Sequence, residues 1–478
     1  MDDVVLIPKD GHLPELQQAL EYYPKYDAYQ WFEDGIDRRL AQKALYLADI
    51  RYAPDYNYDK LRERQFPNED GESSLVEKSR IQAAISRLQI AGEKNELPQD
   101  IVQLYINANI RYLKMQLMVE AADDALRAPG SAEATLAIET YKRLNKEVYG
   151  EFDAEAFKQL IGQEKDWVLH FEPKNAEARR LRQNVLLHLG DVEPVPKQEL
   201  IDQDLIDTYK PFLLDRYGHI LDVMPSGDDY LSPEDTNEVF NKAIGASGLA
   251  DAGWQSVLDK NKTIVATNMR EKLIKLPTNI HRTANQLRAL MLHELEVHAR
   301  RGFNGSQLGY PIFETGTANY FDNEEGLGVI LEALFLGKAH DNPAVSRAVQ
   351  RYIHVGLALG QDTSGERPRD ARQTHYITWQ IAALKLAKNG IVTEKEIQAA
   401  KTSTYDHIEN IFRSTNFSIP GHIYAKAKIY YEGLIGNIGI LRRIAADPKE
   451  FDKLFWAKYD HLDPEEAEII ARLHSSKK

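Results

Sequence analysis

One short segment and a single glutamate carry the strongest chemical pattern in the chain: residues 293–298 read HELEVH, and Glu325 follows 27 residues after the second histidine. Two imidazoles and a carboxylate are a ligand set of catalytic zinc, and they leave the fourth tetrahedral position to water. Glu294, next to the first histidine, is suited to accept the proton of that water. The pattern therefore predicts Zn²⁺ bound by His293, His298 and Glu325, with Glu294 as the catalytic base.

The spacing of these histidines differs from that of the familiar metallopeptidase motif, in which they lie four residues apart on one face of a helix. Five residues of an α-helix leave an angular offset of roughly 140°. His293 and His298 would then point in nearly opposite directions. A single π-type turn absorbs one residue and returns both rings to the same side. We therefore predict a helix with a local π-bulge between Glu294 and Val297.

Two helices are expected to present these ligands. Residues 283–286 (TANQ) match a capping box that begins the first helix, and residues 304–305 (NG) are a typical stop. In the second helix we predict Asn323 as the N-cap and Gly337 as the end.

The glycines of the second helix indicate close packing, and its other glutamates have separate expected roles. Gly326 and Gly328 each cost about 1 kcal/mol relative to alanine, which indicates that another backbone lies close. Packing against the histidine helix would meet that need. Glu332 lies seven residues after Glu325 on the same face, where it is expected to orient a ligand histidine. Glu324 is predicted to be a solvated charge near the helix start.

The motif and its surroundings resemble a known family. Residues 293–307 (HELEVHARRGFNGSQ) and 324–332 (EEGLGVILE) resemble the tyrosine or phenylalanine metallocarboxypeptidases, QEGLA-motif proteins that include the microtubule-associated tyrosine carboxypeptidase. A weaker similarity lies at residues 425–433 (AKAKIYYEG), and the resemblance can be traced from about residue 200 to 460. It implies a zinc-dependent carboxypeptidase that removes a C-terminal, aromatic residue from a peptide or protein.

Several positions depart from the family pattern. Glu324 replaces a glutamine, Gly328 replaces an alanine, and Ala425 and Ala427 stand where a threonine and an aspartate flank Lys426. The metal ligands and the base are thus kept while groups on the substrate side differ.

A carboxypeptidase must also hold a free carboxylate, which calls for a lysine or an arginine. Lys426, at the family's lysine position, is the first candidate and Arg413 is the second, although most such residues are surface cations. Tyr430, Tyr320 and His422 are candidates for the donor that stabilises the oxyanion.

Arg300 and Arg301 are expected to complement the C-terminal end of the histidine helix. Lys272, Lys275 and Arg282 are among the basic residues that would supply positive charge to a cleft.

Composition narrows the class of protein. The chain has 478 residues, of which 43% are hydrophobic and 28% charged, as in soluble globular proteins of more than one ordinary domain. The absence of cysteine excludes disulfides, thiolate metal ligands and thiol catalysis. A net charge of −14 disfavours binding to nucleic acid or to anionic membranes. An acidic start and the lack of an 18-residue apolar run predict a cytoplasmic location.

The overall pattern predicts an α+β fold that is mainly α. Residues 1–190 are expected to form a helical region of unknown role, followed by a linker at 190–196. A zinc metallocarboxypeptidase-like domain with a small β-sheet is expected at 197–478. Strands at 254–258 and 263–267 are predicted to pair with each other, and 272–276 is a candidate third strand. An edge of such a sheet can pair with an extended peptide.

Two other functions remain open at this point. One is a zinc endopeptidase or aminopeptidase, in which Glu324 would be a candidate to hold an N-terminal amine. The other is a non-enzymatic regulatory or binding protein that keeps the metal for stability. The sequence leaves the natural substrate and the oligomeric state undetermined.

Overall fold

The computed structural model describes residues 36–49, 74–94, 97–127, 129–225, 229–260, 262, 264–337, 342–363, 365, 367–413 and 415–476. Within these ranges the chain is mainly helical and contains one three-stranded sheet, which confirms the predicted α+β class.

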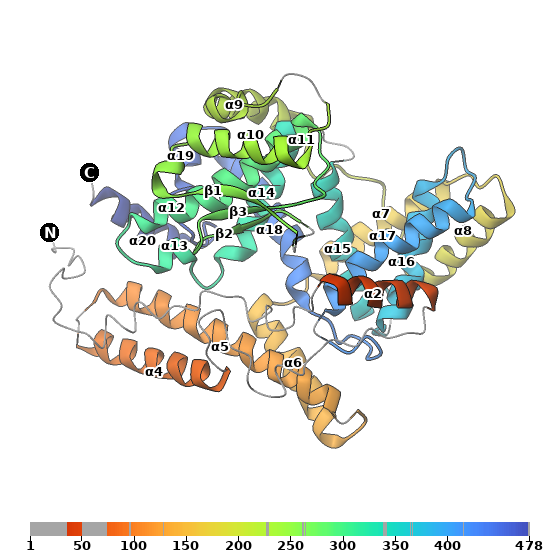
Figure 1. Ribbon diagram of the computed structural model, residues 1–478. Coiled ribbons are helices and arrows are strands. Elements are labelled where there is room, and N and C mark those ends of the chain that lie inside the picture. Colours follow the sequence, from red (N-terminus) through yellow and green to blue (C-terminus); the bar gives the residue numbers. More distant parts are fainter. Residues whose placement is uncertain are drawn as a thin grey trace.

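Six helices lie in the described part of the first 190 residues. They are α2 (Ile36–Ala48), α4 (Ser74–Glu93), α5 (Gln99–Arg127), α6 (Ala132–Tyr149), α7 (Ala154–His170) and α8 (Ala176–His188). Figure 1 shows α4 and α5 running side by side along one side of the molecule, below α13 and α20. The polar residues that precede α6, α7 and α8 accept hydrogen bonds from the first backbone amides of these helices, which explains where each one begins.

The remaining helices follow in the second part of the chain. They are α9 (Gln203–Leu221), α10 (Pro233–Ala246), α11 (Ala284–Met291), a π-helix (Leu292–Arg300), α12 (Arg301–Ser306), α13 (Ile312–Thr315), α14 (Tyr320–Leu336), α15 (Pro343–Leu359), α16 (Ala371–Leu386), α17 (Glu394–Phe412), α18 (Ile429–Ile444), α19 (Pro448–Lys453) and α20 (Pro464–Ser475). Two short 3-10 helices span Ala250–Ala252 and Ala425–Lys428.

The sheet has the order β1-β3-β2, with β1 at Gln255–Asp259, β2 at Ala266–Asn268 and β3 at Leu273–Pro277. β3 pairs in parallel with β1 and antiparallel with β2. The predicted direct pairing of the first two strands is therefore wrong. Ile274 and Leu276 of β3 are fully buried, whereas β1 and β2 are mostly half-buried. The most apolar strand takes the central place, and β2 is left as an edge.

Two predicted helix boundaries are also wrong. α14 begins at Tyr320 with Asn319 as its N-cap, and Asn323 is a buried residue inside the helix whose side chain bonds to Asp460. α12 continues through Ser306, so residues 304–305 do not stop it. The predicted end at Gly337 is confirmed, with a left-handed φ of 65°.

The glycines of α14 allow the close packing that the sequence predicts. A Cβ at Gly326 would clash with the backbone of Gly433 in α18, and a Cβ at Gly328 would clash with the imidazole of His293. α18, rather than the histidine helix, is thus the backbone that approaches Gly326. Residues of α14 and α18 belong to the largest of the hydrophobic clusters, which also contains Leu292, Leu295 and other residues of the π-helix.

Helices before residue 190 share hydrophobic clusters with later elements. α4 and α5 pack with residues 308–313 and with α20, while α7 and α8 pack with α15, α16 and α17. A third cluster joins α5 and α6 to α17 and to the residues before α18. The division into regions 1–190 and 197–478 stays a prediction. If either region folded alone, it would lack the hydrophobic contacts that the two regions share.

Replacing Gly326 with alanine should lower the free energy of unfolding by about 1–3 kcal/mol, because the new methyl group forces α14 and α18 apart. Gly439→Ala is the matched control, since a Cβ at that position in α18 meets nothing within 4 Å. It should raise stability by about 0.5–1 kcal/mol. Thermal and urea unfolding measure both. Equal stability of the two variants would refute the close contact.

Candidate metal centre

The helix that carries both histidines contains the predicted distortion, over a longer stretch than expected. Thr283 and Gln286 form a complete capping box at the start of α11. The α-helix then gives way to a π-helix over Leu292–Arg300, where hydrogen bonds run from residue i to i+5. His293 and His298 consequently face the same side, with ring centroids 4.9 Å apart.

Three side chains converge beside this helix. The Nε2 atom of His293 lies 3.8 Å from Oε2 of Glu325, and the Nε2 atom of His298 lies 3.8 Å from Oε1 of the same carboxylate. One atom from each of the three residues lies within 4.8 Å of the others, and no other group of this kind occurs in the described part of the chain. Zinc bonds of about 2.0–2.2 Å in tetrahedral geometry would hold ligand atoms about 3.3–3.6 Å apart. The separations here, 3.8 Å from Glu325 to each imidazole and at most 4.8 Å among the three atoms, are somewhat wider, and this donor set could hold a metal ion.

A carboxylate holds the other nitrogen of each imidazole. His293 Nδ1 lies 2.6 Å from Glu332, and His298 Nδ1 lies 3.0 Å from Glu324. Such contacts fix the plane of each ring, and in the neutral imidazole with the proton on Nδ1 they would turn the lone pair of Nε2 toward the convergence point. Glu332 is the residue that the sequence pointed to for this position, and Glu324 is not.

The prediction that Glu324 is a solvated charge is wrong. Its side chain is 1% exposed and contacts Arg301 Nη1 at 3.2 Å and Lys458 Nζ at 3.0 Å. Burial by itself would raise the pKa of Glu324, but Lys458, His298 and Arg301 outweigh it and hold the pKa well below its usual range. Arg301 is completely buried and its guanidinium contacts Glu324 and the carbonyls of Ala457 and Tyr459, so the expectation that it complements the C-terminal end of the histidine helix is wrong.

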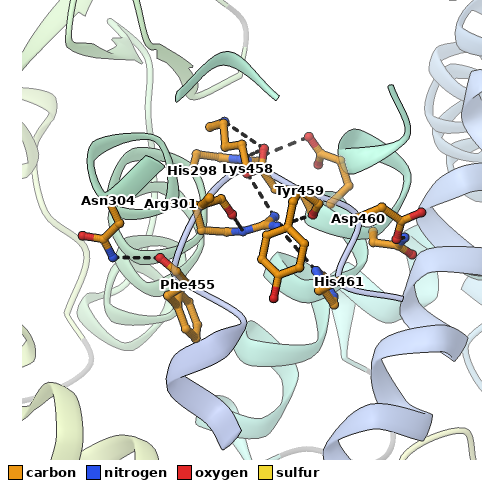
Figure 2. Close-up of polar contacts among 12 residues, drawn as sticks. His298, Arg301, Asn304, Phe455, Lys458, Tyr459, Asp460 and His461 are labelled. Atoms are coloured by element: carbon orange, nitrogen blue, oxygen red, sulfur yellow. Dashed lines mark hydrogen bonds and ion pairs between the residues drawn. The ribbon is translucent and has the colours of Figure 1, made fainter. Parts of the chain in front are cut away.

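A C-terminal loop encloses this buried charge (Figure 2). Arg301 donates from Nε to the carbonyl of Ala457 at 3.0 Å and from Nη2 to the carbonyl of Tyr459 at 2.7 Å. The side chain of Asn304 donates to the Phe455 carbonyl at 2.7 Å. Each nitrogen of the guanidinium thus contacts a carbonyl, a histidine or Glu324, and the loop that supplies Lys458 is tied to the helix that carries the two histidines.

Charges within the site also affect the presumed ligands. Burial opposes protonation of His293, yet its contacts with Glu325 and Glu332 raise the pKa of the imidazole well above its usual value. Burial likewise opposes ionisation of Glu325, but the two histidines lower its pKa. The three carboxylates around the imidazoles therefore favour a positive charge at this point, which a divalent cation would supply.

Glu294 lies next to this group on the π-helix and is 6% exposed. The hydroxyl of Thr267, in edge strand β2, donates a hydrogen bond of 2.6 Å to its Oε2 atom. Both residues line the same cavity as the three presumed ligands. The contact holds the carboxylate beside the candidate metal site, and no feature of the sequence pointed to Thr267.

A cavity of about 1490 Å³ opens on the site. Its walls come from β2 and β3, from α14 and α15, and from α5, whose Arg111 and Tyr112 show that the first 190 residues contribute to it. Lys426, Tyr430 and Tyr320 line the cavity, as expected of substrate contacts.

Arg413 and His422 are not among the residues that line this cavity. Arg413 is 8% exposed at the end of α17, and His422 is fully buried with its ring against Tyr141. The structure therefore does not bring these two candidates to the metal site.

Several basic residues do lie on the cavity walls. Lys272, Lys275 and Arg282 are there, as the sequence led us to expect, together with Arg347 and Arg351 of α15, which sequence reasoning missed. Their spacing of four residues on one helix was the available signal, but nothing in the sequence indicates which way that helix faces.

Comparison with known proteins agrees with this geometry. A family model described as the microtubule-associated tyrosine carboxypeptidase matches residues 229–342. That segment of the chain is similar to this family. It contains the sheet, both histidines and the three glutamates of α14 that surround them, so the earlier resemblance is supported where the site lies. A search of curated proteins found no match.

Replacing Glu324 with alanine should lower the free energy of unfolding by roughly 3–5 kcal/mol, because Arg301 and Lys458 would be left as buried, unpaired cations. Zinc affinity should fall about 10–100-fold, since His298 loses the group that orients it. Glu139→Ala is the control, because it removes an exposed pair with Lys142 and should change stability by less than about 0.5 kcal/mol. Unfolding curves and zinc titration test both. Unchanged zinc affinity in Glu324→Ala would contradict the orienting role.

A second glutamate fastens the same loop. Burial raises the pKa of Glu466 to about 7, although the Thr317 hydroxyl donates to its carboxylate at 2.7 Å and the Asp460 amide donates at 2.8 Å. The folded state therefore binds a proton that the unfolded chain releases near the ordinary carboxyl pKa of 4.5.

This raised pKa predicts a pH dependence of stability. The contribution of protonated Glu466 is complete below pH 4.5 and is lost as the pH rises through 7, at a cost of about 3 kcal/mol. In urea unfolding at pH 5 and pH 8, Glu466→Gln should lose that part of the difference. Glu468→Gln, on the exposed side of the same helix, should keep it. A wild-type pH dependence in Glu466→Gln would show that this carboxyl is not responsible.

Proposed function

We propose that this chain is a zinc-dependent carboxypeptidase that removes a C-terminal residue, aromatic by resemblance, from a peptide or protein. The observation that carries the proposal is the convergence of His293, His298 and Glu325 beside Glu294, inside a cavity large enough for the end of a peptide. The match of residues 229–342 to a carboxypeptidase family model supports the same reaction class.

Glu294 has the central role among the chain's own groups in this proposal. Bound zinc would lower the pKa of a water molecule and polarise the scissile carbonyl. Glu294 would accept the proton of the attacking water and pass it to the leaving amine. The hydrogen bond from Thr267 to Oε2 leaves Oε1 of Glu294 to do so. Glu324 and Glu332 would keep the two imidazoles in the orientation that the ion requires.

Substrate contacts are proposed from the cavity walls. Edge strand β2 contributes Ala266, Thr267 and Asn268 to the lining, and an extended peptide can pair with the backbone of such an edge. Lys426 and Tyr430 stay candidates for contacts with the substrate. Burial, followed by the charge of Glu325, raises the pKa of Tyr430, so its hydroxyl keeps the proton that an oxyanion donor needs.

The aminopeptidase alternative loses the residue that supported it. An N-terminal amine would need an available carboxylate, and Glu324 already contacts His298, Arg301 and Lys458. The endopeptidase and the non-enzymatic alternatives are decided by activity measurements. No helix among the described residues is both long and apolar enough to cross a membrane. The cytoplasmic location stays a prediction.

Replacing Glu294 with glutamine should leave zinc content unchanged and lower the rate of hydrolysis by at least about 10²–10⁴-fold, because glutamine cannot accept a proton. Peptides that end in tyrosine or phenylalanine, with free or blocked N- and C-termini, are the substrates. Cleavage of N-blocked but not C-blocked peptides is expected. Cleavage of C-blocked peptides would indicate an endopeptidase, and activity of Glu294→Gln equal to wild type in every assay would favour a non-enzymatic role.

His293→Ala and Glu325→Ala test the proposed metal ligands. Each should abolish stoichiometric zinc in the purified protein, measured by elemental analysis, because two ligands hold the ion far more weakly than three. Arg413→Ala is a control that lies outside the cavity and should keep its zinc. Full zinc content in both ligand variants would remove the proposed site.

A further inference from the structure

Two arginines of α15 face the cavity without an acidic partner. Arg347 and Arg351 lie four residues apart, hence on one face of the helix, and both line the cavity. Among the residues that the structure describes, neither forms an ion pair, and the buried Nε atom of Arg351 has no hydrogen-bond partner. A buried guanidinium donor without an acceptor is costly, so this wall is suited to receive one.

Three other cations of the cavity already have an acidic partner. Arg111 pairs with Asp322 at 3.0 Å, Lys458 pairs with Glu324, and Lys275 pairs with Glu271. The two arginines of α15 differ from these three residues in having no acidic partner.

Arg347 and Arg351 lie near residues of the candidate metal centre. The guanidinium of Arg351 lies 4.5 Å from the ring centroid of Tyr430, the residue whose hydroxyl is affected by the charge of Glu325. Arg347 is within electrostatic range of Glu332, the partner of His293. Both guanidinium groups thus lie on the wall next to the presumed metal, at the side of His293 and Glu325.

The electrostatic balance of this wall favours an anion. Arg347 is exposed to solvent in part, and desolvation together with the nearby Arg282 and Arg351 lowers its pKa, with only Glu332 acting against them. Three arginines share this wall, and Glu332, the carboxylate that acts on Arg347, already contacts His293 Nδ1. An added carboxylate would relieve the repulsion among them. Apolar lining residues next to them, such as Ile280, Val329 and Ala348, suit an anion attached to an apolar group rather than a free inorganic ion.

We propose that Arg347 and Arg351 bind the terminal carboxylate of the substrate and so select a free C-terminus. This inference rests on the proposed carboxypeptidase function and names the residues that make the enzyme act at a chain end. Arginine suits the task because its planar fork donates two parallel hydrogen bonds to one carboxylate. Lys426, the first candidate from the sequence, lies with its ammonium 4.4 Å from the ring centroid of Phe321 and becomes the rival for this role.

Equilibrium binding tests the inference separately from catalysis. The parent protein is full-length, zinc-loaded Glu294→Gln. The probes are two fluorescent N-blocked hexapeptides ending in tyrosine, one with a free carboxylate and one with a terminal amide, followed by fluorescence anisotropy. The parent should bind the acid at least about 10-fold more tightly than the amide. Adding Arg347→Gln or Arg351→Gln should weaken binding of the acid about 10–100-fold and leave the amide unchanged.

Controls separate a specific role from general damage. Lys275→Gln, which removes a cavity cation that already has a partner, should keep the preference for the acid. Arg347→Lys and Arg351→Lys keep the charge but not the fork, and each should show an intermediate loss, which keeps the test open if a glutamine variant does not fold. Zinc content and melting temperature are measured for every variant.

The outcomes are distinct. The inference is overturned if the parent binds neither peptide or binds both equally, or if the preference survives in both arginine variants. It is also overturned if the preference disappears in Lys426→Gln alone. If the wild type cleaves no peptide while the acid preference depends on the arginines, the proposed catalysis fails and the carboxylate site stands.

Discussion

The structure depends on the placement of negative charge around two buried imidazoles. Glu332 and Glu324 hold the Nδ1 atoms, and Glu325 faces both Nε2 atoms. Carboxylates so close together repel one another and are costly to bury. Only positive charge makes the arrangement stable, and the chain supplies part of it from Arg301 and Lys458 on the far side of Glu324. A divalent cation would provide the remainder.

This constraint explains features that lie far from the site in sequence. Lys458 and the carbonyls that hold Arg301 belong to a loop next to the C-terminal helix, which packs on α4 and α5. α5 in turn lines the cavity. The first helices of the chain thus act on the site in two ways, as a wall and as support for the loop. A role of this kind fits a region whose own sequence shows no chemical motif.

Close backbone packing is the second requirement. α14 can bring Glu325 to the histidines only if it lies against the His293 ring, and Gly328 leaves room for that ring. On its other side, Gly326 lets α18 approach, and α18 carries Tyr430 at the start of the helix. The two glycines weaken the helix locally, and the packing they allow sets the positions of Glu325 and of the cavity wall that carries Tyr430.

The sequence by itself determined what is local. Residues 283–286 specify a capped helix start, the five-residue histidine spacing requires a π-type turn, and Gly337 ends α14, because each depends on backbone chemistry within a few residues. The tertiary structure alone decided that Glu324 is buried, that β3 lies between β1 and β2, and that Arg347 and Arg351 face the cavity. These outcomes depend on which distant side chains arrive next to each residue, and spacing along the chain carries no information about that.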